Sequence, residues 1–493
     1  MASADEFDEY IVTASDIDAR VVIGKGKEEN IPTYSLKIPR LESATVAFME
    51  DLKVQLLKQI TISSQEALDI KMSQKLKDKF SDMAKKMITE NMPHVTEKKA
   101  QTMCGLLVHD MLGLGDVEFL LNDNLIEEVC INSSTEPVWI YHRKHGWIKT
   151  DVYINSENQI WNYSSSIARR IGRQINTQNP LLDAYLPSGD RVNATLYPIS
   201  SFGNTITIRK FARKPWTITD YINSNTITSE TAALLWLAIQ YETNIIVSGG
   251  TGAGKTSLLN VLTSFMPINQ RVVSIEQTRE ITLPAGLQWV PLVVREATSE
   301  GSGNVSMLDL MVNALRMRPD RIIVGEIRRA EEAQVLFEAM HTGHSVYATL
   351  HAETADETLR RLTHEPINIP SVMMESLHLV VPMYRDRRTG RRRVYEIAEI
   401  VPTEKEGVRT NLLYRWRTNS DKLLKDENSV RILNVIKTYA NMDDSEIRET
   451  LEERKKILDW LVKKDIKTVD KVGGIISRYY SNPDEVLKLV RGK

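Results

Sequence analysis

Residues 244–265 hold the sequence pattern that most restricts how this chain can fold. An apolar run, 244–248, leads directly into a loop that satisfies G-x-x-x-x-G-K-[S/T], and a helical pattern, 257–265, follows it. The glycines permit positive φ and let backbone N–H groups point at phosphate oxygens, while the helix adds its positive dipole end. The order strand, loop, helix predicts a phosphate-binding loop, and a glycine-rich turn without a ligand is the alternative.

Two residues at the end of this loop carry its chemistry. Lys255 can reach the β- and γ-phosphates of a nucleotide, and the hydroxyl of Thr256 can ligate Mg²⁺. We therefore expect ATP and Mg²⁺ as the cofactors. The residues expected to bind the nucleotide are Gly249, Gly250, Thr251, Gly252, Ala253, Gly254, Lys255, Thr256 and Ser257.

Beyond residue 212, helical patterns alternate with short apolar runs, which is typical of a mostly parallel sheet. A run at 289–293 is a weaker candidate because Pro291 interrupts it. The stronger candidate strands are 244–248, 271–275, 321–324 and 346–350.

Two of these apolar runs are followed by a glutamate. A carboxylate at the carboxyl end of a strand in an open α/β sheet faces the ligand crevice. We expect Glu326 to ligate the metal together with Thr256, and Glu276 to orient the attacking water. Each glutamate could instead be a structural acid at a strand end.

Three histidines lie in the segment 341–353. The spacings of three and seven between His341, His344 and His351 do not match a familiar zinc cluster. We expect a polar, phosphate-sensing role for His344 and His351. Packing histidines and a metal site are the alternatives.

Composition and charge narrow the class of protein. Hydrophobic residues make up 42% of the 493 residues and charged residues 26%, which excludes wholesale disorder. The net charge of −2, without aromatic residues interleaved with basic ones, argues against a nucleic-acid partner. The acidic segment 1–18 and the lack of an apolar run of about 18 residues favour a cytoplasmic location, with any membrane association peripheral.

These motifs together resemble the secretion ATPase superfamily, whose members serve type II and type IV secretion, type IV pili and the archaellum. By this resemblance the glycine-rich loop is the Walker A motif, and the Asp box, Walker B motif and His box lie around Glu276, Glu326 and 344–351. The resemblance spans roughly residues 113–400. Its supporting segments are 123–132, 180–193, 206–211, 249–256, 275–276, 315–328 and 342–352.

The resemblance implies a ring-forming homohexamer with a RecA-like P-loop ATPase domain. It also implies that arginines of the preceding domain reach the nucleotide, and Arg191 and Arg209 match those positions. A guanidinium on the γ-phosphate can raise the rate about 10³- to 10⁵-fold. Either arginine could instead form an ion pair on a strand surface.

The patterns divide the chain into three regions. Residues 1–112 are expected to form strands plus a helical bundle, with helices near 64–90 and 96–112. Residues 113–211 are expected to form an α+β domain, and 212–493 the α/β ATPase domain with a helical C-terminal tail.

Two departures from the family pattern matter. The Asp box usually continues with an aspartate, but Gln277 follows Glu276 here. Many bacterial members carry a tetracysteine zinc module, which Cys104 and Cys130 cannot build. The lack of this module, with the N-terminal region and the tail, resembles the archaeal branch that drives archaella and archaeal type IV pili.

The expected function is an ATP-hydrolysing motor that drives assembly of a type IV pilus-like surface filament through an integral membrane platform protein. A type II or IV secretion ATPase or a filament-retraction ATPase is the alternative. A hexameric nucleic-acid translocase and a nucleotide-gated scaffold that barely hydrolyses ATP are rivals from other classes.

Six arginines fall within nine residues around Gly390. A turn between two strands is the plain structural interpretation. The alternative is a docking patch for an acidic loop of the platform protein, or for an anionic membrane surface. The six are Arg385, Arg387, Arg388, Arg391, Arg392 and Arg393.

Overall fold

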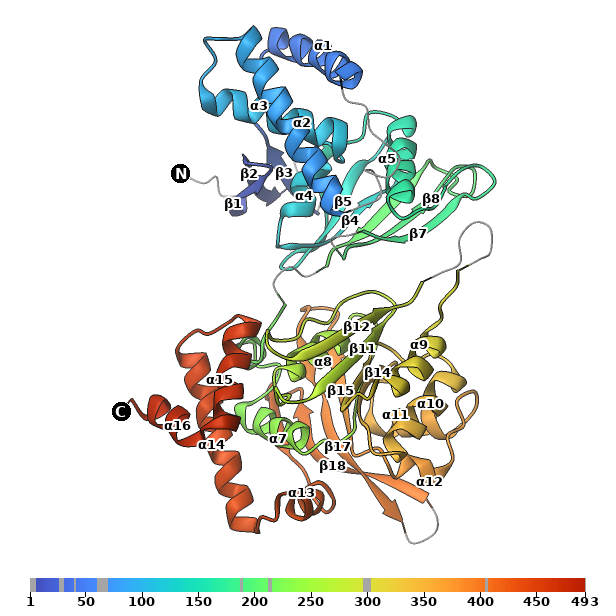
Figure 1. Ribbon diagram of the computed structural model, residues 1–493, viewed down its shortest axis with the longest axis vertical. Helices are drawn as coiled ribbons and strands as arrows, with labels where there is room; N and C mark the ends of the chain where they lie inside the picture. Colours follow the sequence, from blue (N-terminus) through green and yellow to red (C-terminus); the bar gives the residue numbers. More distant parts are fainter. Residues whose placement is uncertain are drawn as a thin grey trace. The chain divides into compact units, whose positions relative to one another are not determined.

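The computed structural model describes residues 6–25, 31–39, 41–59, 70–186, 189–211, 215–295, 303–403 and 407–492. The chain divides into two compact units, Met1–Arg213 and Lys214–Lys493 (Figure 1). In the described part of the chain, no helix is both long and apolar enough to cross a membrane.

The first unit is built on one mainly antiparallel sheet. Its strand order is β1-β2-β3-β6-β5-β4-β9-β8-β7, and β3 and β6 form its parallel pair. The strands are β1 Glu6–Ala14, β2 Ile17–Lys25, β3 Pro32–Lys37, β4 Ile126–Ile131, β5 Pro137–His142, β6 Gly146–Tyr153, β7 Leu181–Tyr185, β8 Arg191–Thr195 and β9 Thr205–Arg209.

Helices complete this unit. Buried apolar side chains on α1, α2 and α3, among them Leu52, Phe80 and Leu107, form a core of their own, as the helical periodicity predicts. Part of the expected helix 64–90 lies outside the described residues. The helices are α1 Ser43–Gln59, α2 Ile70–Asn91, α3 Glu97–Leu112, α4 Val117–Asn122 and α5 Glu157–Arg170.

The N-terminal strands share the sheet of the segment that follows residue 112. Thr33 and Tyr34 of β3 pair with Lys149 and Thr150 of β6. The hydroxyl of Tyr34 also donates to the buried Asp123, at 3.0 Å. The sequence separates 1–112 from 113–211, whereas the structure joins strands of both in one sheet.

The second unit is a largely parallel α/β sheet. Its strand order is β12-β11-β13-β14-β10-β15-β17-β18-β19, with β16 paired to β15. The parallel strands are β10 Ile245–Gly249, β11 Arg271–Glu276, β12 Gln288–Val293, β13 Arg321–Val324, β14 Ser345–Leu350 and β15 Leu379–Arg385. The antiparallel strands are β16 Arg392–Val394, β17 Glu396–Thr403, β18 Gly407–Arg417 and β19 Lys422–Lys425.

The sheet order confirms the predicted RecA-like fold. The four strongly predicted strands are present as β10, β11, β13 and β14. The strand β14 separates β10, before the phosphate loop, from β13, before Glu326. The weaker run became β12, where Pro291 is tolerated because β12 is an edge strand.

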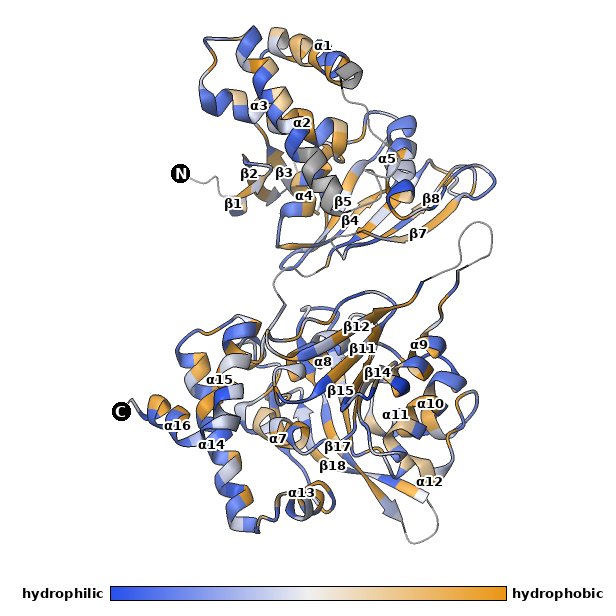
Figure 2. Ribbon diagram, in the orientation of Figure 1, coloured by the Kyte–Doolittle hydropathy of each residue, from blue (hydrophilic) through white to orange (hydrophobic). Residues whose placement is uncertain are grey.

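Helices cover both faces of this sheet (Figure 1). Ile245 and Val247 pack with α7, α8 and the C-terminal helices, whereas Ile246 packs with α9, α10 and α11. Figure 2 shows the strands between these layers largely in apolar colours, as expected of a sheet buried on both faces. The helices are α6 Ile218–Asn223, α7 Ser229–Gln240, α8 Lys255–Thr263, α9 Met307–Ala314, α10 Ala330–His341, α11 Ala355–Thr363, α12 Ser371–Met374, α13 Ile432–Ala440, α14 Asp444–Lys463, α15 Val469–Ser481 and α16 Pro483–Arg491, with a 3-10 turn at Leu315–Met317.

Candidate nucleotide-binding site

The glycine-rich loop joins the end of β10 to the start of α8. Gly249, Gly252 and Gly254 have φ of 152°, 70° and 96°, a region that other residues rarely adopt. A Cβ on Gly249 would stand 2.6 Å from the carbonyl oxygen of Met383. Glycine is therefore required at the first loop position by both backbone conformation and space.

Lys255 and Thr256 open helix α8. The Lys255 ammonium donates to the carbonyl oxygens of Gly249 and Gly250, at 3.0 and 3.3 Å, and so lies over the loop. Gly254 caps the helix in the left-handed conformation. The backbone N–H groups and the positive dipole end of α8 therefore lie close to the Lys255 ammonium. This arrangement suits a polyphosphate.

Glu276 ends β11 and is almost fully buried, with 1% of its surface exposed. Its Oε1 accepts hydrogen bonds from the backbone N–H groups of Glu280 and Ile281, at 2.8 and 3.0 Å. Its Oε2 has no hydrogen-bond partner among the described residues. Burial raises the pKa of this carboxyl to about 7, against the lowering effect of the two N–H groups.

An unpartnered buried carboxylate oxygen is costly, and such groups are concentrated where a protein carries out chemistry. Glu276 stands at the carboxyl end of its strand, where ligands of open α/β sheets bind. It therefore fits a site that receives a polar ligand or water.

Glu326 lies two residues beyond the end of β13. Its Oε2 accepts from Nε and Nη2 of Arg328, at 2.8 and 2.7 Å, and its side chain is 28% exposed. The hydroxyl of Thr349 on β14 donates to the Gly325 carbonyl at 2.6 Å, which fixes the backbone here. A Cβ on Gly325 would stand 3.5 Å from Cα of Glu276, so the two acidic segments are neighbours.

His351 reaches the glycine-rich loop. It directly follows β14, and its Nε2 lies 3.1 Å from the hydroxyl of Thr251. His344 instead precedes β14, and its Nδ1 lies 3.2 Å from the carbonyl oxygen of Ala339. The strand rises about 3.3 Å per residue, so its six residues put His344 about 20 Å from this edge. The structure brings His351 to the loop but not His344.

Arg191 and Arg209 belong to the first unit. They are paired across β8 and β9, which places both guanidinium groups on one face of that sheet. Arg191 contacts Asp183 at 2.7 Å, and Arg209 lies 3.9 Å from Glu128. Both arginines are exposed on the sheet surface.

Two arginines near the loop were not expected there from the sequence. Arg392 donates from Nε to the carbonyl oxygen of Gly252 at 3.0 Å. A Cβ on Gly252 would stand 2.7 Å from Nη1 of Arg385. The segment of the six arginines predicted the hairpin that β15 and β16 form, but it did not predict that this hairpin contacts the glycine-rich loop.

The residues present fit a nucleotide with Mg²⁺. The glycine cradle, the N-terminus of α8 and Lys255 suit phosphate oxygens, and the unpartnered Oε2 of Glu276 lies at the same sheet edge. Mg²⁺ in such sites is held by one or two side chains and by substrate phosphates. No group of three His, Cys, Asp or Glu side chains that could hold a metal occurs in the described ranges.

Fold and site together define a RecA-like P-loop nucleotide-binding protein. Residues 110–385, more than half of the chain, match the family described as type II/IV secretion system protein. The chain therefore belongs to this family.

Relatives of this chain are found in archaea and bacteria. The protein MJ0900 of Methanocaldococcus jannaschii is 33% identical over 399 residues, which are 79% of this chain and 72% of that protein. MJ0781 of the same archaeon is 27% identical, with coverage of 94% and 91%. The type IV secretion system protein PtlH of Bordetella pertussis is 32% identical over 306 residues, with coverage of 55% and 89%.

Solved structures show more distant likeness. The VirB11 ATPase of the Brucella suis type IV secretion system is 25% identical, with coverage of 56% of this chain and 93% of that chain and a TM-score of 0.29. The ATPase DotB of Legionella pneumophila is 20% identical, with coverage of 76% and 93% and a TM-score of 0.41.

Proposed function

We propose that this chain is an ATP-hydrolysing motor that drives assembly of a type IV pilus-like surface filament, an archaeal pilus or archaellum. It acts as a homohexamer on the cytoplasmic face of the membrane, through an integral membrane platform protein. Membership of the type II/IV secretion system family and similarity to proteins of an archaeon support this proposal.

One observation carries the enzymatic part of the proposal. The buried Glu276 keeps one oxygen without a hydrogen-bond partner among the described residues, at the sheet edge where the glycine-rich loop begins α8. A carboxylate poised near neutral pH suits a group that orients water and accepts its proton.

The other site residues divide the work of holding the nucleotide. The loop N–H groups and Lys255 bind phosphate oxygens, and Thr256 and Glu326 hold Mg²⁺, which neutralises charge on the phosphates when bound. His351 is hydrogen-bonded to the hydroxyl of Thr251 and responds through that contact to whether the loop holds phosphate. Arg191 and Arg209 of the first unit supply positive charge to the γ-phosphate.

A type II or IV secretion ATPase, or a filament-retraction ATPase, is the second candidate. The 32% identity to PtlH, named as a type IV secretion system protein, favours it specifically. A nucleic-acid translocase is a weaker rival, because the net charge of −2 provides no general attraction for phosphate backbones.

Deletion of the gene, followed by electron microscopy of surface filaments and a swimming assay, tests the biological role. We expect loss of filaments, restored by the wild-type gene and not by Glu326→Gln at equal protein level. Loss of pili with normal swimming would assign the motor to pili rather than to the archaellum. Normal filaments and normal swimming would contradict the proposal.

A further inference from the structure

The hairpin of β15 and β16 runs along the glycine-rich loop on the side of Gly252. The carbonyl oxygen of Met383 closes the space beside Gly249, as described above. Arg392 donates to the Gly252 carbonyl, and the Arg385 guanidinium lies beside the same glycine. Two of the six clustered arginines therefore contact the middle of the loop, and they come from the same unit as the loop itself.

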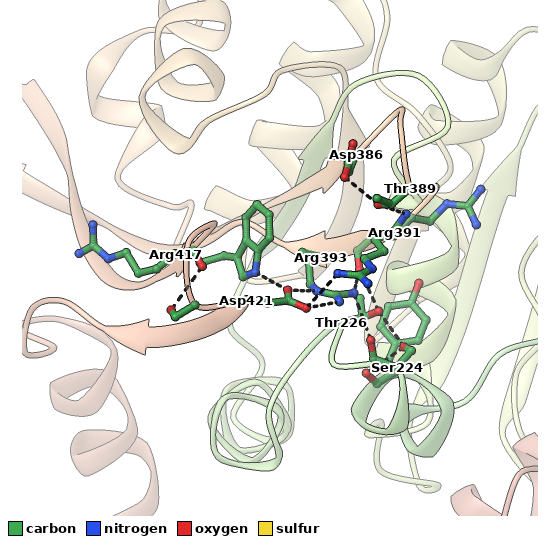
Figure 3. A network of polar contacts seen from close by, with 12 residues as sticks. Ser224, Thr226, Asp386, Thr389, Arg391, Arg393, Arg417 and Asp421 are labelled. Carbon is green, nitrogen blue, oxygen red and sulfur yellow. Dashed lines mark hydrogen bonds and ion pairs between the residues drawn. The ribbon is translucent and has the colours of Figure 1, made fainter.

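Strand geometry explains why Arg392 faces the loop. Successive side chains of a strand point to opposite sides, so Arg392 and Arg393 of β16 diverge. Arg393 is buried and donates from Nε and Nη2 to the two carboxylate oxygens of Asp421, at 2.7 and 2.8 Å (Figure 3). Its Nη1 also donates to the Ser224 carbonyl at 3.1 Å. The pair lowers the pKa of Asp421 to about 2.

Further bonds fix the base of the hairpin. The hydroxyl of Thr226 donates to the Arg392 carbonyl at 3.0 Å, and Trp416 donates to Asp421 at 3.0 Å. At the tip, the hydroxyl of Thr389 donates to Asp386 at 2.7 Å (Figure 3). A bidentate arginine–carboxylate pair holds its geometry well, so the backbone of Arg392 is positioned independently of the loop.

We propose that Arg385 and Arg392 are positioning residues of the nucleotide site, which hold Gly252 so that the loop presents its N–H groups to a nucleoside polyphosphate. The inference rests on the proposed nucleotide binding and extends it to a hairpin outside the expected motifs. A glycine-rich loop has many accessible backbone conformations, and ordering it opposes binding. A loop held in advance by a charged donor loses less conformational freedom on binding.

The test is the dissociation constant of ADP with Mg²⁺, measured by titration calorimetry on the full chain. Loss of one hydrogen bond to a charged donor corresponds to about a tenfold change, so Arg392→Gln should raise the constant about tenfold. Arg387→Gln is the matched control. Arg387 is exposed in the turn between β15 and β16, and its replacement by glutamine removes the same charge. We expect it to stay within about twofold of wild type.

Variants that differ in charge at position 392 separate a positioning role from a general loss of structure. Arg392→Lys keeps the charge and should bind ADP more tightly than Arg392→Gln. Equally weak ADP binding by the two variants would refute a role for the charge in the contact with Gly252. If Arg392→Gln lowers the melting temperature, Arg385→Gln serves in its place, since the Arg385 guanidinium lies beside the same glycine.

Two results would overturn the inference in distinguishable ways. Affinities of Arg392→Gln and Arg385→Gln equal to that of Arg387→Gln, with Lys255→Ala unable to bind, would reject the hairpin role and leave the nucleotide site intact. Wild-type affinity in Lys255→Ala would reject the nucleotide site itself and the inference with it.

Discussion

Replacement of the buried Glu276 by glutamine should change how the stability of the chain depends on pH. Glutamine has nearly the same shape and can accept the same two backbone N–H bonds through its amide oxygen, but it does not titrate in this range. The difference in free energy of unfolding between wild type and Glu276→Gln therefore isolates the titration of this one carboxyl from that of all other groups.

The magnitude follows from the burial of the carboxyl. Its pKa rises from 4.5 to about 7, so the folded chain binds this proton more tightly than the unfolded chain does. The associated stabilisation is fully present below pH 4.5 and is lost as the pH rises through 7. Integrated between about pH 5 and pH 8, the change is about 2.5 kcal/mol.

Urea unfolding of both chains at several pH values, followed by tryptophan fluorescence, measures this difference. The stability of Glu276→Gln relative to wild type should increase by about 2.5 kcal/mol from about pH 5 to pH 8. A difference that stays constant within about 0.5 kcal/mol would show that Glu276 titrates normally, and would refute the description of it as buried and unpartnered.

Three further outcomes test the site. Gly249→Ala should destabilise the chain by about 2 kcal/mol in thermal or urea unfolding, because its Cβ meets a backbone oxygen and its φ is strained. Gly250→Ala, whose Cβ has its nearest atom 3.7 Å away, should stay within about 0.5 kcal/mol, and equal effects would contradict this geometry. The rate of ATP hydrolysis should rise as the pH passes through about 7, since Glu276 must ionise to accept a proton, and a flat profile would contradict that role. His351→Ala should slow hydrolysis more than His344→Ala, because only His351 contacts the loop.

The sequence predicted the loop and its sheet because their signals are local. The apolar run before Gly249 and the spacing of Lys255 and Thr256 lie within a few residues of one another. The four strongly predicted strands follow from apolar runs of strand length, which a sheet covered on both faces requires.

Features that depend on distant parts of the chain were not predictable in this way. The pairing of β3 with β6 joins residues more than 100 positions apart, and a parallel pair of strands leaves no turn signal. The expected phosphate-sensing role of His344 assumed that both ends of the segment 344–351 lie at the nucleotide site. The parallel strand β14 separates the two ends of that segment, and only the carboxyl end lies beside the loop.

The arginine cluster shows the same limit at smaller scale. The hairpin was predictable from Thr389 and Gly390, which predict a turn between two strands. The sequence did not predict that Arg392 faces the loop and Arg393 faces away from it. These directions depend on Asp421 and on the position of the loop in three dimensions.

ATP turnover of the wild-type chain beside Glu326→Gln tests the central claim most directly, with Glu331→Gln as the matched control. Glu331 is an exposed glutamate of α10, so its replacement removes the same charge close by in the chain. We expect turnover to fall at least about a hundredfold in Glu326→Gln, because the proposed Mg²⁺ ligand is lost, and to be unchanged in Glu331→Gln. Equal rates in wild type and Glu326→Gln would contradict the assignment of this edge of the sheet as the site of ATP hydrolysis.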